Sequence, residues 1–151
     1  MSSIPLARLF AMGMNTLVTG LHARLAERGF PDVRPAFAFV LLAARDRSLT
    51  GNDVAELMGM TKQAASKLID AMEAEHFVSR KPHPADARAK VLQIAPRGRR
   101  LLATAESIYA ELEDEWAEVL GRARVDAMRS DLTEVLLATN DGALPAIRPS
   151  R

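Results

Sequence analysis

The N-terminal part of the chain repeats apolar residues every three or four positions. The pattern runs from Leu6 to Leu25, with Pro5 suited to a first helical position and Gly29 suited to a stop. It predicts an amphipathic helix over about residues 5–28. A second helix is predicted over 33–45, and because it is apolar nearly all round we expect it to be buried.

The C-terminal part shows the same periodicity. From Arg97 apolar residues recur at steps of three and four up to Val119, Gly121 follows, and a further stretch runs from Val125 to Leu136. Both stretches are predicted to be helices. Their apolar stripes exceed what the short middle of the chain can cover, so we expect them to pack against a second copy of the chain. The tail, residues 139–151, is rich in proline and small residues, and we expect disorder at its end.

The middle of the chain begins with two short helical signals separated by a glycine. The run Thr50-Gly51-Asn52-Asp53 has the form of a capping box, with Asp in place of the usual Glu or Gln. The helix that follows stops at Gly59, and Thr61 is a good N-cap for the next one. Two short helices joined by a tight turn that contains glycine predict a helix-turn-helix.

The second of these helices has one apolar and one polar side. Winding it at 100° per residue places on the apolar side Ala64, Leu68, Ala71 and Met72. The polar side carries Lys62, Gln63, Ser66 and Asp70, with Lys67 at its edge. Cations and an amide near a helix start suit phosphate contact and the reading of base edges. An ordinary solvated helix face has the same general character, so the neighbouring elements decide between the two interpretations.

Those neighbours are two short runs that read as strands, 77–81 and 89–94, joined by a loop with two prolines. Basic residues flank the loop: Arg80, Lys81, Arg88 and Lys90. Asp86 is expected to pair with Arg88 and to hold the tip in shape. A solvated hairpin is the alternative, but a basic hairpin directly after a helix-turn-helix predicts a wing that touches the DNA backbone or a minor groove.

Composition narrows the class of protein. The 151 residues are 48% hydrophobic and 26% charged, which suits one globular domain with an appendage. The longest apolar run, 36–44, is far shorter than the roughly 20 residues that span a bilayer, and the N-terminus has no secretory signal pattern. With no cysteine, disulfides and thiol chemistry are excluded, and we expect a cytoplasmic protein that does not associate with a membrane.

The net charge of +1 hides an asymmetry along the chain. Residues 61–100 hold nine basic and four acidic side chains, whereas residues 101–151 hold five basic and ten acidic ones. A basic middle with a near-neutral and an acidic flank is expected when one surface meets a polyanion such as double-stranded DNA.

Taken in order, these features resemble the winged-helix core of the MarR (multiple antibiotic resistance regulator) family. The resemblance rests on the paired helices around Gly59 and Thr61, the run LIDAME, the Asp86-x-Arg88 wing motif and Gly98, and with the flanking helices it covers about residues 5–138. It implies a mainly α fold with a small β-hairpin wing: a winged helix-turn-helix flanked by long N- and C-terminal dimerisation helices. The implied divisions are a dimerisation helix in 1–32, a DNA-binding domain in 33–96, dimerisation helices in 97–138 and a tail in 139–151.

The resemblance also implies a function. Members are homodimers that bind a pseudo-palindromic operator, usually as repressors, and many release DNA on binding a small aromatic or phenolic effector. Together with the residue patterns it gives a set of expected DNA-binding residues: Thr61, Lys62, Gln63, Ala64, Ser66, Lys67, Arg80, Lys81, Asp86, Arg88 and Lys90.

Three departures from the family pattern bear on local structure and on the operator. In the family a glycine is common directly after the second helix of the helix-turn-helix, the recognition helix, and His76 stands at this position. We therefore expect a left-handed backbone conformation at a residue that tolerates it less well than glycine. Ala95 replaces a capping threonine, with Pro96 as partial compensation. Small residues stand at positions often held by larger or polar groups, namely Ala64, Ala65 and Ala87, which points to an unusual base sequence.

Other chemistry finds little support in the sequence. The three histidines, His22, His76 and His83, are far apart, and without cysteine we expect neither a metal site nor a cofactor. The carboxylates on the last long helix are expected on a solvated face with no nucleophile or base nearby, so we expect no enzyme. The alternative function is a winged helix that serves as a protein–protein adaptor and never touches DNA.

Overall fold

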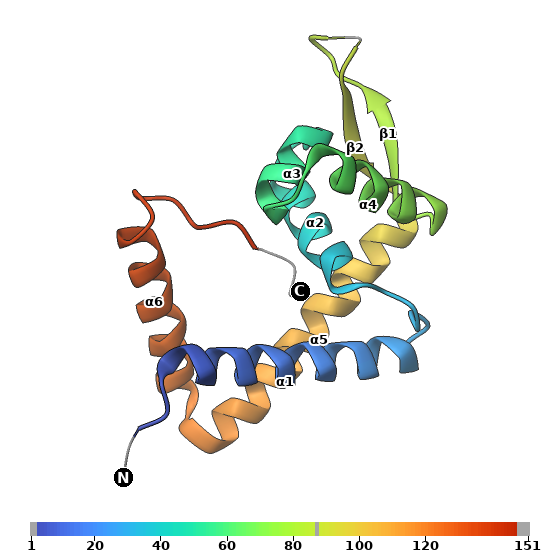
Figure 1. The fold of residues 1–151 in the computed structure, drawn as a ribbon. Coiled ribbons are helices and arrows are strands. Elements are labelled where there is room, and N and C mark those ends of the chain that lie inside the picture. The colour runs from blue at the N-terminus through green and yellow to red at the C-terminus, as the bar shows by residue number, and fades with distance from the viewer. Residues whose placement is uncertain (1–2, 87, 148–151) are drawn as a thin grey trace.

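Two long helices, α1 (Leu6–Glu27) and α5 (Pro96–Leu120), cross and carry a lobe formed by the middle of the chain (Figure 1). The structure is a computed structural model that describes residues 3–86 and 88–147. The lobe contains α2 (Pro35–Asp46), α3 (Gly51–Met58), α4 (Lys62–Ala74) and the antiparallel strands β1 (Val78–Pro82) and β2 (Lys90–Ile94). The last helix, α6 (Arg122–Ala138), turns away from the end of α5. The predicted mainly helical fold with a hairpin wing is confirmed.

The helix-turn-helix forms through the caps that the sequence predicts. The backbone N–H of Asp53 donates to Thr50 Oγ1 at 3.2 Å, and the N–H of Thr50 donates to Asp53 Oδ2 at 2.8 Å, so both halves of the capping box are present. Gly59 ends α3 in the left-handed region at φ 62°. Thr61 caps α4, because its hydroxyl accepts from the N–H of Ala64 at 3.1 Å. Three local signals therefore fix where the two helices begin and end.

The C-terminus of α4 is closed by a left-handed residue that is not glycine. His76 has φ 64°, as expected from its place in the sequence. Its N–H donates to the carbonyl of Glu73 at 3.0 Å, and the N–H of Phe77 donates to Met72 at 2.9 Å, which is the Schellman pattern. The turn aims the chain directly into β1.

The buried side of α4 differs from the prediction at two of its four residues: Ala65 is buried in place of Ala64, and Ile69 in place of Ala71, which is half-buried. The residues that face the core are Ala65, Leu68, Ile69 and Met72, whereas Ala64 is exposed. Two adjacent alanines do not differ in hydrophobicity, so the helical periodicity of the sequence could not indicate which of them faces the core. The spacing of the other buried residues sets the rotation of the helix, and it places Ala64 on the outer side together with the polar residues.

The hairpin is attached to the lobe by a contact that the sequence did not predict. The N–H of Leu92 in β2 donates to the carbonyl of Leu49 at 2.8 Å, and Thr50 forms a bridge with Val91. Strand β1 also runs one residue further than predicted and includes Pro82, opposite Lys90. A proline is tolerated at this end of an edge strand. The short segment before α3 therefore acts as a third strand that fixes the base of the wing.

The start of α5 packs tightly against the junction between α4 and β1. The rings of Phe37 and Phe77 lie 5.8 Å apart, and the guanidinium of Arg97 lies 4.8 Å above the Phe77 ring. Gly98 follows, and a Cβ added to it would lie 2.1 Å from the carbonyl oxygen of Phe77. Only a glycine lets the helix approach the backbone this closely. As predicted, Ala95 provides no side-chain cap here, and Pro96 occupies the first helical position.

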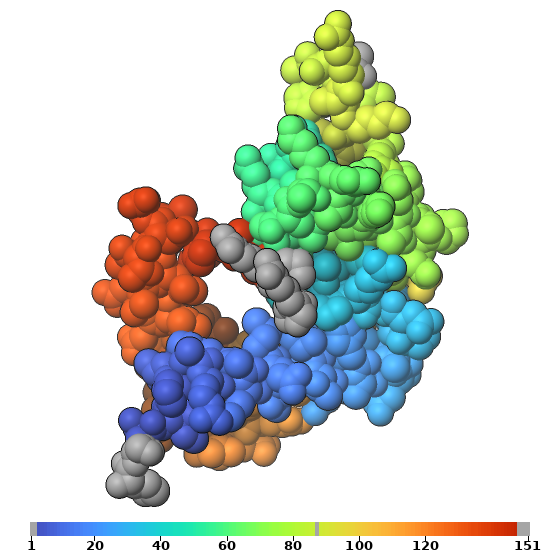
Figure 2. All heavy atoms as spheres, viewed as in Figure 1, coloured from blue at the N-terminus to red at the C-terminus, as the bar shows by residue number. Residues whose placement is uncertain are grey.

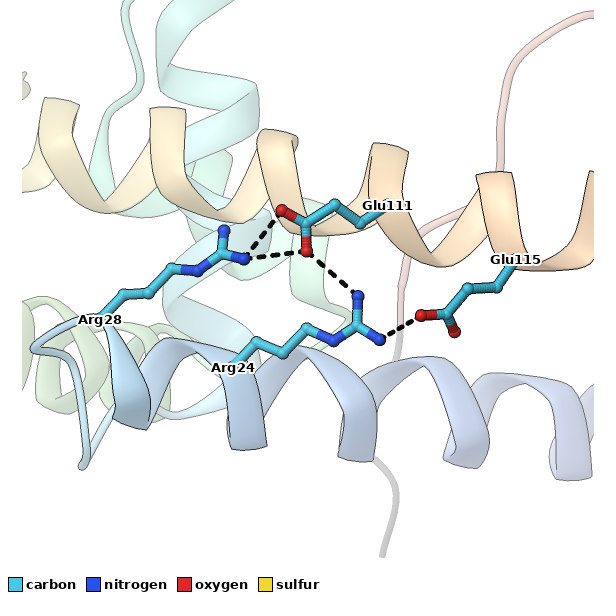
Figure 3. Close-up of polar contacts among 4 residues, drawn as sticks. All are labelled: Arg24, Arg28, Glu111 and Glu115. Carbon is cyan, nitrogen blue, oxygen red and sulfur yellow. Dashed lines mark hydrogen bonds and ion pairs between the residues drawn. The ribbon is translucent and has the colours of Figure 1, made fainter.

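The crossing of α1 and α5 is held by an ion-pair cluster (Figure 3). Arg28 Nη2 lies 2.8 Å from both carboxylate oxygens of Glu111, and Arg24 bridges Glu111, at 3.1 Å, and Glu115. The hydrogen bond from Arg28 is the largest cause that lowers the pKa of the Glu111 carboxyl below its usual range. On the other side of α5, Glu113 pairs with Arg129 of α6 and Asp114 with Arg122.

These carboxylates lie at the solvated surface, as expected, with the side chains of Glu111, Glu115 and Asp114 40%, 54% and 65% exposed, but their ion pairs were not predicted. Their partners lie in other helices, α1 and α6, which periodicity within α5 could not reveal.

The ends of the chain leave apolar residues uncovered. In α1 the inner residues Leu21 and Leu25 are buried, whereas the exposed large apolar residues of the terminal helices include Leu6, Leu9, Phe10, Met12, Met14, Met128, Leu132 and Val135. Figure 2 shows an open space between α6 and the lobe. The tail returns to the lobe, where the N–H of Ile147 donates to the carbonyl of Leu57 at 3.0 Å. The disorder expected at the end of the tail concerns residues 148–151, which lie outside the described residues.

Candidate DNA-binding surface

The outer side of α4 presents the polar residues of the expected recognition helix. The exposed residues are Thr61, Lys62, Gln63, Ala64, Ser66 and Lys67. The Thr61 hydroxyl is engaged in capping the helix. In the described part of the chain, the side chains of Lys62, Gln63 and Lys67 form no hydrogen bond or ion pair with another residue, so they are available to an external partner. All lie in the first two turns, where the helix N-terminus favours anions.

The hairpin projects from the lobe beside α4 and carries further free cations (Figure 1). Lys81, Arg88 and Lys90 are exposed, and no ion pair joins them to other residues within 3–86 and 88–147. The space-filling view shows the hairpin as a narrow protrusion beyond α3 and α4 (Figure 2). The structure therefore brings the basic residues of the helix and of the wing to one end of the molecule.

Asp86 shapes the tip in a different way from that expected. Its Oδ1 accepts from the backbone N–H of Arg88 at 3.0 Å, and no pairing with the Arg88 guanidinium is present. A carboxylate bonds easily to the backbone two residues on, which closes a local turn. His83 contributes a second such contact, because its Nδ1 accepts from the N–H of Ala85 at 3.0 Å. The turn is thus held by backbone contacts, and the Arg88 side chain stays free. Ala87, between them, lies outside the described residues.

Arg80 does not join this exposed set. Its Nη1 lies 2.8 Å from Asp70 Oδ1 and 2.9 Å from Glu73 Oε1, and its Nη2 donates to the carbonyl of Ser66 at 3.3 Å. Asp70 lies on the polar face of the helix, as expected, but its pairing with Arg80 and that of Glu73 were not predicted. The available signal was a pair of carboxylates three residues apart on one helix, followed by an arginine in the adjoining strand.

The charge pattern of the rest of the molecule contrasts with this surface. Arginines of α1 and α6 pair with the carboxylates of α5, and Arg45 of α2 pairs with Glu106. Most carboxylates of α5 are thus paired with arginines, whereas among the described residues the cations of α4 and, apart from Arg80, those of the hairpin form no ion pair. An unpaired positive surface on a protein of nearly zero net charge is suited to a polyanion.

No other site of comparable definition occurs in the described residues. No group of three or more His, Cys, Asp or Glu within 3–86 and 88–147 is placed to hold a metal ion. Burial lowers the pKa of His22 and raises that of Tyr109, but neither group lies among the DNA-surface residues. None of the described helices has both the length and the apolar character needed to cross a bilayer.

A short helix, a tight turn, a second helix with a free polar face and a basic hairpin together define a winged helix-turn-helix. Residues 28–89 match the family model described as MarR family. This part of the chain is therefore similar to the MarR family, in agreement with the resemblance seen in the motifs around Gly59, Thr61 and Asp86. No functionally curated protein matches the chain.

Solved structures extend the similarity to the flanking helices. Wild-type MarR from E. coli in its apo form is 22% identical with a TM-score of 0.71, over 89% of this chain and 99% of that one. MepR, a transcription regulator of the Staphylococcus aureus multidrug efflux pump MepA, is 21% identical with a TM-score of 0.67, over 91% of this chain and all of that one. A mutant of S. aureus MepR bound to an oligodeoxyribonucleotide is 22% identical with a TM-score of 0.59, over 91% of this chain and all of that one. At these identities the similarity establishes a shared fold, including the long terminal helices.

Proposed function

We propose that this protein is a transcription regulator that binds a pseudo-palindromic DNA operator as a homodimer, usually to repress. The observation that carries the proposal is the set of exposed cations and amides on α4 and the hairpin, which form no ion pair with the described residues and gather at one end of the molecule. The complex of a MepR mutant with an oligodeoxyribonucleotide, a protein similar in fold, supports DNA as the polyanion.

Within this surface we assign different roles to different residues. Gln63 and Ser66 are the candidates for base edges, because their side chains are uncharged and carry both donor and acceptor atoms. Lys62 and Lys67 are the candidates for phosphates, and the hairpin adds Lys81, Arg88 and Lys90 against the adjacent backbone or minor groove. In this proposal residues 33–96 form the DNA-binding unit.

The dimer is proposed from the uncovered apolar residues of the terminal helices, within residues 1–32 and 97–138. Phe10 and Val135 are 49% and 56% exposed, although both lie in periodic apolar stripes. Burial of such residues is worth about 1.5–3 kcal/mol each, so a two-fold partner that covers them gains free energy. Two recognition helices would then lie about one DNA turn, roughly 34 Å, apart.

Selection of bound sequences from random duplexes tests DNA binding and symmetry together. We expect an inverted repeat whose half-sites are one turn apart, and sedimentation of the 16.5 kDa chain as a dimer. Gln63→Ala or Ser66→Ala should relax the preference at one position of each half-site, at a cost of about 1–3 kcal/mol. Arg124→Ala is the matched control, because Arg124 is an exposed cation of α6, away from α4. An unchanged selected sequence in both α4 variants would refute the assignment of readers.

The adaptor function makes the opposite prediction for the same experiment. A winged helix that binds only proteins should enrich no sequence, and its retention on heparin should not depend on Arg88. A monomer that binds a single half-site tightly would refute the proposed dimer while leaving DNA binding intact.

The proposal includes a small aromatic or phenolic effector, which the resemblance implies, placed between the terminal helices and the lobe. The open space beside α6 in Figure 2 is compatible with such a position. An effector can release DNA only if it binds the DNA-incompetent state more tightly than the competent one. Trp116 in α5 offers a fluorescence reporter for titration with a panel of simple phenols. If no phenol changed either the fluorescence or the DNA affinity, the proposed effector would be contradicted.

A further inference from the structure

Arg80 points from the middle of β1 back onto the side of α4 and is the least exposed arginine of the basic hairpin. Its side chain is 22% exposed, against 63% for Asp70 and 42% for Glu73, the two carboxylates that it binds. Arg80 Nη1 donates to both carboxylates, and Nη2 donates to the Ser66 carbonyl. The planar guanidinium therefore forms hydrogen bonds along two of its edges.

The three partners of Arg80 form one stripe along α4. Ser66, Asp70 and Glu73 are separated by four and then three residues, so they lie above one another on successive turns. The stripe borders the buried side of the helix formed by Ala65, Ile69 and Met72. A single side chain from the strand therefore spans two turns of the helix that carries the candidate base readers.

The backbone of Arg80 is itself held in place. Arg80 is paired with Leu92 in the ladder, and Leu92 is buried and bonded to the carbonyl of Leu49. The ion-pair cluster thus connects α4 to the fixed base of the wing rather than to its tip. Rotation of α4 relative to the hairpin would have to break contacts to both carboxylates.

Electrostatics argue against a direct phosphate contact. Asp70 and Glu73 bring two negative charges and Arg80 one positive charge, so the cluster remains negative. A phosphate that approached Arg80 would meet both carboxylates within a few ångströms, where repulsion is not screened by salt. Without Arg80, the two carboxylates would stand uncompensated on the helix that faces DNA.

We propose that Arg80 is a positioning residue, which locks the recognition helix and the wing into one DNA-reading unit and neutralises Asp70 and Glu73, and that it does not contact phosphate. The proposal rests on the proposed function for its effect on DNA, and it replaces the expectation that Arg80 binds DNA directly. It distinguishes Arg80 from Lys81, the next residue of the strand, whose side chain is exposed.

The dependence of affinity on salt tests the absence of a phosphate contact. Arg80→Ala should weaken binding of the selected operator several-fold with the same slope of log affinity against log salt as the wild type. Lys81→Ala, the matched removal of a cation, should lower that slope by roughly 0.9. A slope lowered to the same extent by Arg80→Ala would overturn the proposal.

A double-mutant cycle with the wing tests the positioning role. If Arg80 holds helix and wing in register, Arg80→Ala should cost less in an Arg88→Ala background than alone, with a coupling of roughly three- to tenfold in Kd. Adding Asp70→Asn and Glu73→Gln to Arg80→Ala should recover part of the lost affinity, because it removes the uncompensated charges. Strict additivity with Arg88→Ala would overturn the proposal.

The Arg80→Lys variant and hydrogen exchange provide two further tests of the positioning role of Arg80. Arg80→Lys retains the charge but cannot present two planar edges, so it should bind with intermediate affinity and an unchanged slope, and it serves if Arg80→Ala does not fold. Hydrogen exchange without DNA should be faster in the second half of α4 and in the hairpin of the Arg80 variants. If the wild type bound no DNA, the proposed function would fail, whereas unchanged exchange in a DNA-binding protein would refute the role of Arg80 alone.

Discussion

Gly98 is the position at which a single methyl group should do most damage to the fold. In Gly98→Ala the new Cβ would lie 2.1 Å from the carbonyl oxygen of Phe77, and ordinary contact begins at 3.4 Å, so the two backbones must separate by 1.3 Å. Overpacking of this kind costs about 1–3 kcal/mol. The same carbonyl accepts from the N–H of Ala95 at 3.0 Å, and weakening that bond costs about 1 kcal/mol more. The better helix propensity of alanine offsets at most about 1 kcal/mol, which leaves a net loss of roughly 1–3 kcal/mol.

Urea unfolding followed by circular dichroism, at one fixed protein concentration, measures this loss. Gly13→Ala is the matched control, because Gly13 lies within α1 and an added Cβ would meet only the Trp116 side chain, at 3.6 Å. We expect Gly13→Ala to be neutral or stabilising by about 0.5–1 kcal/mol. A Gly98→Ala protein whose free energy of unfolding lies within about 0.5 kcal/mol of the wild type, the usual range for a surface substitution, would show that the inferred close approach is wrong.

Three further outcomes are expected. Arg88→Ala should weaken binding to all DNA sequences and lower the slope of log affinity against log salt by roughly 0.9, measured by fluorescence anisotropy. Full affinity of this variant at moderate salt would show that the wing does not contribute to DNA binding. His76→Gly should raise the free energy of unfolding by up to about 1 kcal/mol, because it relieves a left-handed residue, and a loss of stability would contradict this. Glu111→Gln should lower the unfolding midpoint at neutral pH. Because the folded pKa of Glu111 is depressed, its contribution is present above the unfolded pKa and disappears as pH falls through the folded pKa; Glu118→Gln is the control, and a pH-independent difference would refute the ion pair.

Local signals in the sequence were sufficient for most of the fold. The caps at Thr50 and Thr61, the left-handed Gly59 and the proline at the start of α5 each act within one turn, so they can be read without knowledge of the rest of the chain. The wing was predictable because its strands and its loop are contiguous. The choice between Ala64 and Ala65 was not, since it depends on how α4 rotates against the core.

The contacts that could not be predicted join residues far apart in sequence. Arg24 and Arg28 meet Glu111 across 87 and 83 residues, and Leu49 pairs with Leu92 through the backbone alone. Backbone pairing leaves no trace in side-chain identity, and an arginine has many possible carboxylate partners. The same ambiguity made Arg80 look like one more basic residue of the wing.

The return of the tail to α3 has a consequence for where probes are attached to this protein. Because the N–H of Ile147 bonds to the carbonyl of Leu57, a label at Ile147 reports on the helix-turn-helix and not on α6, which precedes it in the chain. A label near Leu6 reports instead on the far end of α1. The chain contains no cysteine, so one thiol introduced at either place can be modified selectively, and the two ends of one polypeptide can be observed separately.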